Sequence, residues 1–194
     1  EGVTYSTKDI FDHSEDLDAH HFPLFNSAYI GTAYQTFPHR TYHSLTLTAN
    51  RLYGEIICVQ RPMTFSDIWC EVSTQAGQKL RFGVYNANAN LTPNALQKDY
   101  GEITLASTGI KGITSDLVVA TPGYYYVCLV SDGTPTISGL YFTSTPLGAD
   151  VTSLYTHYCG FYGTHTYGAL PATFPTPTIS LTLPNVMLET KTLD

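Results

Sequence analysis

Carboxylate side chains are the residues that could carry acid–base chemistry here, and they form no recognisable pattern. Asp67 with Glu71, and Asp99 with Glu102, are spaced closely enough to be considered as pairs. Hydrolysis of a glycosidic bond needs two carboxyl groups roughly 5–10 Å apart. Neither pair lies in an enzyme motif, and the sequence has no GxSxG elbow, HExxH or phosphate-binding glycine loop. We therefore expect no catalytic residues and no enzymatic activity; solvated surface carboxylates are the simplest interpretation.

Possible metal ligands gather in two places. The acidic run from Asp9 to Asp18 would suit calcium, and the following His20-His21 would suit zinc or nickel. The run lacks the glycine and the final glutamate of an EF-hand loop. Cys159 is flanked by His157 and His165, but their spacing matches no common zinc site. A solvated arm and histidines hydrogen-bonded within an interface explain these residues better, so we expect no metal and no cofactor.

Neutral polar side chains beside aromatic rings form two groups that could bind a carbohydrate. Sugars stack on exposed tyrosine rings and exchange hydrogen bonds with neutral polar groups. One group lies in an asparagine-rich loop and the other in a segment rich in glycine and tyrosine. The candidate ligand-binding residues are Tyr85, Asn86, Asn88, Asn90, Tyr162, His165 and Tyr167. Asparagine is also a common turn residue, because it tolerates left-handed backbone, so a purely structural interpretation of the first group stays open.

The composition favours β-sheets. The 194 residues include 15 Tyr, 15 Gly and 11 Pro, and only 13% are charged, against roughly 25% in an average globular protein. The net charge of −7 and the absence of a basic stripe exclude a nucleic-acid partner. No apolar run approaches the ~20 residues that span a bilayer, and the N-terminus does not resemble a signal peptide. We therefore expect no membrane insertion.

Strand-like segments follow one another between turn signals. Residues 65–72 alternate, with Ile68, Cys70 and Val72 on one side and Trp69 and Glu71 on the other. Trp69 is therefore either a sugar platform or a plug between two sheets, and burial is the simpler interpretation. The run 124–130 is apolar on both sides, which predicts a central strand. Other candidate strands begin at Leu45 and cover 80–85, 103–106, 117–120, 179–183 and 186–188, with 93–98 as the one short helix candidate.

These segments predict an all-β fold, an antiparallel β-sandwich that is jelly-roll-like and carries an extended N-terminal arm. We expect the arm to span 1–44, as an anchor, and the sandwich to span 45–194. Residues 151–188 contain no Asp, Glu, Lys or Arg. A solvent-facing stretch of that length would normally carry charges, so the sandwich itself or neighbouring copies should cover it. Cover by the sandwich itself and cover by neighbouring subunits both stay open at this point.

Three of the four cysteines lie in apolar, strand-like runs, namely Cys58, Cys70 and Cys128. In such runs a cysteine usually acts as a small buried hydrophobic residue. A Cys58–Cys70 disulfide stays open, because neighbouring antiparallel strands could bring the two together.

From about Asn50 to Gly148 the chain resembles a β-sandwich module of tailed-bacteriophage virion proteins, often found in tail fibres. The motifs that carry the resemblance are, in order, NRLYGEIICVQRPMTFSDIWCEV, LRFGVYNANANLTPNAL, GEITLASTGIKGIT and LVVATPGYYYVCLVSDG. The segment YGALPATFPTPTISLTLPNVML is similar to the C-terminal ends of such fibre proteins. The resemblance implies a structural virion protein that contacts copies of itself and other virion proteins at the particle surface, as a homotrimer or another homo-oligomer.

On this basis we expect a tail-fibre or receptor-binding domain that attaches to host cell-surface carbohydrate. The alternative is a capsid decoration or head-fibre protein that cements or ornaments the shell, with the N-terminal segment threaded between capsomers. A third, weaker interpretation is a surface depolymerase. The expected location is the virion surface, on tail or head.

Overall fold

The computed structural model describes residues 33–34, 40–119, 121–142 and 160–193, and these residues form strands and connecting turns without a helix. None of them therefore belongs to a helix that could cross a membrane. Every strand pairing is antiparallel. The strands are β1 (Ala33–Tyr34), β2 (Arg40–Thr46), β3 (Arg51–Val59), β4 (Met63–Thr74), β5 (Lys79–Ala87), β6 (Pro93–Thr104), β7 (Gly109–Val119), β8 (Gly123–Ser131), β9 (Thr136–Phe142), β10 (Gly160–Thr164), β11 (Thr178–Ser180), β12 (Leu183–Pro184) and β13 (Val186–Leu193).

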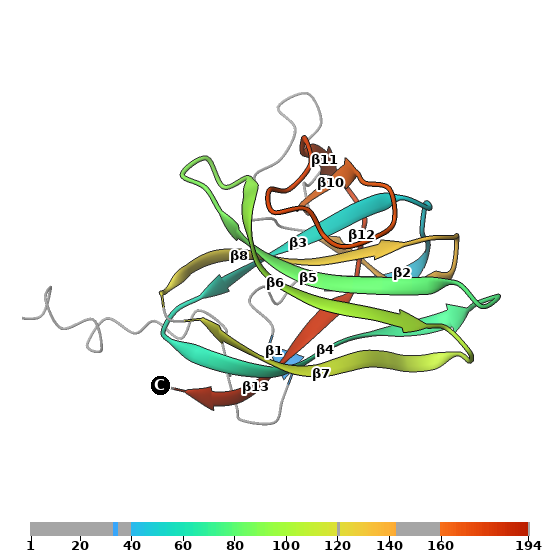
Figure 1. The fold of residues 1–194 in the computed structure, drawn as a ribbon, viewed down its shortest axis with the longest axis horizontal. Helices are drawn as coiled ribbons and strands as arrows, with labels where there is room; N and C mark the ends of the chain where they lie inside the picture. The colour runs from blue at the N-terminus through green and yellow to red at the C-terminus, as the bar shows by residue number, and fades with distance from the viewer. Residues whose placement is uncertain (1–32, 35–39, 120, 143–159, 194) are drawn as a thin grey trace, which may run out of the picture.

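The described strands form two sheets that pack face to face (Figure 1). Sheet A contains β1, β2, β4, β7, β9, β12 and β13, and sheet B has the order β11-β10-β3-β8-β5-β6. Within sheet A, β4 lies between β7 on one side and β13, followed by β9, on the other. The chain crosses between the sheets in each of the connections from β2 to β5. The predicted all-β antiparallel sandwich is confirmed.

The main hydrophobic core lies between the two sheets. Sheet A contributes fully buried side chains such as Phe65 and Ile68, and sheet B contributes Phe82 and Leu129. The predicted alternation in β4 is confirmed, because Ile68, Cys70 and Val72 all belong to this core. Burial raises the pKa of the Cys70 thiol to about 12. Trp69, which has the opposite parity, lies outside the core on the outer side of sheet A, so the interpretation of Trp69 as a plug between the sheets is wrong.

A second core lies on the other face of sheet B. In β8, Tyr125, Val127 and Leu129 face the main core, whereas Tyr126, Cys128 and Val130 face this second one. Residues 160–177, called the strap below, cover it with Phe161, Leu170 and Phe174; in Figure 1 the strap is the orange-red segment around β10. The prediction of a central strand is confirmed, and residues 125–130 are buried on both faces, whereas Tyr124 at the start of the run is exposed. The strap thus covers one face of sheet B, whereas Ile179 and Leu181, further along the uncharged tail, are each 46% exposed.

Two boundary predictions are corrected by the structure. Residues 93–98, considered as a helix, begin β6, where Pro93 starts an edge strand and therefore costs no ladder hydrogen bond. The predicted arm 1–44 includes β1 and the first residues of β2, which pair with β13 and β9 and so belong to sheet A. The rest of that segment, with the acidic run 9–18, lies outside the described residues.

The alternative of a Cys58–Cys70 disulfide is also not seen. Cys58 lies in sheet B and Cys70 in sheet A, and both sulfur atoms are thiols. Cys159 and His157 lie outside the described residues. Cys128 is 0% exposed because its side of β8 faces the second core, and this burial raises the pKa of its thiol.

We predict that Cys128→Ser lowers the free energy of unfolding by about 1–3 kcal/mol, because a hydroxyl replaces a weakly polar thiol among apolar side chains. Denaturant unfolding measures the change. Cys58→Ser is the matched control, because Cys58 is only half-buried, and it should cost less. Equal effects of the two substitutions would contradict the assignment of β8 as a strand buried on both faces.

Candidate functional site

The asparagine group closes its own loop. The side-chain oxygen of Asn88 accepts hydrogen bonds from the backbone N–H groups of Asn90 (2.9 Å) and Thr92 (3.1 Å). Its Nδ2 donates to the Thr92 hydroxyl at 2.7 Å, and the Asn86 oxygen accepts from the N–H of Ala95 at 2.8 Å. Loop closure thus uses the amide groups of Asn86 and Asn88, while Asn90 is exposed at the tip. A ligand contact of Asn90 stays a prediction.

Tyr85 lies in the second core rather than at a surface. It is 0% exposed, its ring packs edge-on against Phe174 with centroids 5.3 Å apart, and its hydroxyl donates to the Pro171 carbonyl at 2.8 Å. A ring in this position offers no face to a sugar. The expectation of Tyr85 as a ligand-binding residue is therefore corrected: it anchors the strap to β5.

Tyr162, His165 and Tyr167 do not form a shared surface. Tyr162 packs against the main core, and the Arg51 guanidinium lies 4.2 Å from its ring centroid. Tyr167 packs against the second core. The His165 Nε2 atom is buried without a hydrogen-bond partner among the described residues. Tyr162 and Tyr167 thus pack against different cores, on opposite faces of sheet B.

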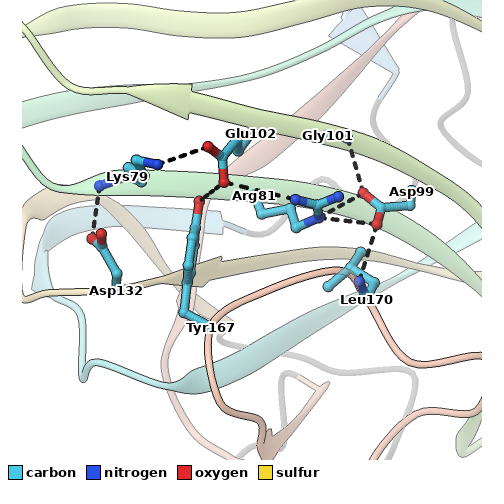
Figure 2. Close-up of polar contacts among 8 residues, drawn as sticks. All are labelled: Lys79, Arg81, Asp99, Gly101, Glu102, Asp132, Tyr167 and Leu170. Carbon is cyan, nitrogen blue, oxygen red and sulfur yellow. Dashed lines mark hydrogen bonds and ion pairs between the residues drawn. The ribbon is translucent and has the colours of Figure 1, made fainter.

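A network of charges holds the strap onto sheet B (Figure 2). Arg81 Nε lies 2.9 Å from both Asp99 carboxylate oxygens, and Lys79 Nζ lies 2.8 Å from Glu102 Oε1. The strap joins at two points: the Tyr167 hydroxyl donates to Glu102 Oε2 at 3.3 Å, and the Leu170 N–H donates to Asp99 Oδ2 at 3.0 Å. We call Lys79, Arg81, Asp99, Glu102 and Tyr167 the polar clasp.

The polar clasp explains the carboxylate pair Asp99 and Glu102. Lys79 bonds to Glu102 and, with Tyr167 and Arg81, holds the pKa of that carboxyl below its usual range. Burial and the neighbouring Glu102 raise the pKa of Tyr167, so its hydroxyl stays a hydrogen-bond donor. Glu102 is thus a permanent anion at neutral pH, which suits an ion pair and does not suit a general acid.

A different set of residues forms a hollow on the outer side of sheet A. It lies over β4 and its two neighbours, has a volume of about 440 Å³, and is open to solvent. Its lining residues come from three strands that are far apart in the sequence: Asp67, Ile68, Trp69, Ile110, Gly112, Thr114 and Glu189. We call this the Trp69 hollow.

Strand register brings these residues together. Asp67 is paired with Thr114 on β7 and with Glu189 on β13, and Trp69 is paired with Gly112 and Met187 in the same way. Paired residues of antiparallel strands share a face. Asp67 and Trp69 are two residues apart on β4 and therefore lie on the same outer side. The ladder between β4 and β7 shifts between Phe65 and Asp67, which explains why Phe65 faces the core instead. The Thr114 hydroxyl donates a hydrogen bond to Asp67 Oδ1.

Gly112 makes room for the indole. A Cβ atom at this position would lie 2.6 Å from Trp69 Cβ and 2.6 Å from the Ile68 carbonyl oxygen. Such contacts are too short for any side chain, so only glycine lets β7 run this close to Trp69. The indole is part-exposed, and Ile110, 69% exposed, stands at the rim. The result is a flat aromatic group flanked by an aliphatic side chain, two carboxylates and a hydroxyl.

This arrangement can bind a molecule with one apolar and one polar side. An indole offers a large apolar face, and carboxylate and hydroxyl oxygens accept hydrogen bonds from ligand hydroxyls or amines. A few converging polar groups around an apolar surface are typical of small-molecule sites. Among the described residues, no three His, Cys, Asp or Glu side chains gather closely enough to hold a metal ion.

The sequence interpretation included Trp69 as a possible sugar platform and Asp67 as a carboxylate of interest, but it did not unite them. Thr114, Gly112 and Glu189 were not singled out, because only the strand pairing reveals that they neighbour Asp67 and Trp69. A second, smaller hollow of about 300 Å³ lies over β2, β4 and β9 and is lined by Tyr42, His43, Ser44, Glu71, Ser73, Ile137 and Ser138. It has no indole and one carboxylate, so the Trp69 hollow is the stronger candidate.

Comparisons with known proteins identify no family for this chain. No family model and no curated protein matches the chain. Among solved structures, it is similar to "the crystal structure of the cysteine protease and lectin-like domains of Cwp84, a surface layer associated protein of Clostridium difficile", at 8% identity and a TM-score of 0.44. The match covers 82% of this chain and 38% of that chain. A likeness at this level carries no information on function.

We predict that Glu102→Gln weakens the polar clasp in a pH-dependent way. The pKa of Glu102 is lowered in the folded protein, so its contribution is complete above the ordinary value of about 4.3 and is lost as the pH falls through the folded value. The variant should have a lower free energy of unfolding than the parent at neutral pH, and this difference should disappear between about pH 5 and about pH 2.

Urea unfolding over this pH range tests the prediction. Glu71→Gln is the control, since Glu71 is exposed on β4 in sheet A, outside the polar clasp. The role of Glu102 would be contradicted if the stability difference between Glu102→Gln and the parent did not change with pH, or if Glu71→Gln showed the same pH dependence.

Proposed function

We propose that this chain is a non-enzymatic binding module that attaches to carbohydrate through the Trp69 hollow. The observation that carries the proposal is the part-exposed indole of Trp69 on an outer sheet face, with Asp67, Thr114 and Glu189 around it. A sugar ring has an apolar face of C–H groups and a rim of hydroxyls. The indole complements the first and the oxygen atoms complement the second.

The form of the hollow favours binding over catalysis. It is a shallow depression on a sheet, open to water, whereas hydrolases exclude water from their reacting groups and keep one carboxyl protonated by burial. The backbone of three paired strands fixes the positions of the lining residues. A rigid, exposed platform loses little entropy when a ligand docks, which supports attachment as its role.

The proposed setting is the surface of a bacteriophage particle, as a tail-fibre or receptor-binding domain that engages host cell-surface carbohydrate. The support is the ordered resemblance over residues 50–148 to virion β-sandwich modules. The proposal includes assembly with copies of itself and with other virion proteins. The capsid decoration alternative shares the setting and differs in the number of copies per particle.

We predict that Trp69→Ala weakens binding of the chain to host cells, or to oligosaccharides released from them, by about tenfold or more, because stacking on the indole is lost. Calorimetry and inhibition of phage adsorption measure the change. Tyr124→Ala is the matched control: Tyr124 is an aromatic residue, 40% exposed, on β8 of the other sheet. Equal binding by the parent and by Trp69→Ala would contradict the proposed site.

The setting has its own test. Quantifying the chain in purified particles separates a few copies at the tail from hundreds on the head. Failure to find it in any particle would contradict the virion setting while leaving the carbohydrate site to stand on the binding data.

A further inference from the structure

We infer that the carbohydrate taken by the Trp69 hollow carries protonated amino groups, so that its ligands are amino sugars with free amines rather than neutral or acidic sugars. This inference rests on the proposed function and specifies its ligand class. The hollow and its indole define the site; the charges around the indole select among sugars.

In the part of the chain that the structure describes, the charged residues that line the hollow are Asp67 and Glu189, and both are negative. Asp67 and Glu189 are paired across neighbouring strands, one on each side of the β4–β13 ladder. Among the described residues, no Lys, Arg or His lines the hollow. An ammonium group placed between two carboxylates gains charge-assisted hydrogen bonds from both, whereas a uronic or sialic acid would meet like charge there.

The two lysines that are nearest in sequence to the lining residues bond to other side chains. Lys191, two residues after Glu189, places its Nζ 2.6 Å from Asp116 Oδ2. Lys111, next to Gly112, donates to the Ser107 hydroxyl at 2.8 Å. Neither lysine is among the described lining residues, and the ion pair of Lys191 is made with Asp116 and not with Glu189.

Thr114 fixes one of the carboxylates in place. Its hydroxyl donates to Asp67 Oδ1, which leaves the second oxygen of Asp67 able to accept from a ligand. The net charge of −7 adds a long-range attraction for cations. Local geometry and overall charge therefore favour the same class of ligand.

Calorimetry with three probes on the full chain tests the inference at about pH 6, where carboxylates are ionised. The probes are the glucosamine tetramer, the N-acetylglucosamine tetramer and the galacturonic acid tetramer. We expect the glucosamine tetramer to bind roughly three- to tenfold more tightly than the N-acetylated one, the uronic acid to bind most weakly, and added salt to reduce the preference.

Variants separate this inference from the proposed function. The double variant Asp67→Asn, Glu189→Gln keeps side-chain size and an acceptor for Thr114, and it should lower the affinity for the glucosamine tetramer more than the affinity for the N-acetylated tetramer, so that the preference is lost. Glu102→Gln is the control for charge alone, because Glu102 lies in the polar clasp of the other sheet, and it should keep the preference.

The outcomes differ for the two claims. Equal binding of all three probes, or a preference that survives in the double variant, overturns the amino-sugar inference and leaves the carbohydrate site intact. Binding of no probe, or binding that survives Trp69→Ala, overturns the proposed site as well. Tetralysine binding as tightly as the glucosamine tetramer, in parent and Trp69→Ala alike, would show attraction by charge alone and would also overturn the inference.

Discussion

The burial of β8 on both of its faces is the constraint on which the rest of this structure depends. Both faces of this strand carry apolar side chains. A two-layer sandwich would bury only one of them, because the other face of the sheet would meet water. Sheet A covers Tyr125, Val127 and Leu129, and the strap covers Tyr126, Cys128 and Val130. The chain is therefore three layers thick over sheet B, and the uncharged composition of residues 160–177 follows from this requirement.

Such a cover must be held at specific points, because apolar packing alone does not fix its register. The polar clasp supplies two of these points, through Tyr167 and Leu170. Backbone bonds supply others, with Leu96 donating to Ala172 at 2.9 Å and Phe174 donating to the Asn94 carbonyl at 2.8 Å. Two of the tyrosines that suggested a binding surface in the sequence, Tyr85 and Tyr167, hold the strap down, whereas Asn86 and Asn88 close their own loop. Their polarity serves attachment within the chain.

The sequence predicted what depends on local pattern. The two-sided apolar run of 124–130 and the alternation of Ile68, Cys70 and Val72 both report the burial of a strand, and both were confirmed. The sequence did not predict what depends on pairing between distant segments. Glu189 meets Asp67 through a register that no local pattern encodes, and Tyr85 could be placed in a core only once the strap was known to cover it. The strand at 93–104 was missed because the proline and asparagine at its start are typical of loops.

The position of Gly112 beside Trp69 also limits how this surface can change. Loop-borne sites are remodelled by insertion and deletion, since their length is free. The Trp69 hollow is built instead on three hydrogen-bonded strands, where a single inserted residue would turn every following side chain to the opposite face. New preferences at this surface must then arise by exchanging one side chain for another on a fixed backbone. That restricts adaptation to discrete steps in charge and shape, with the glycine retained, because a Cβ atom at position 112 would meet the Ile68 carbonyl oxygen and the Cβ of residue 69.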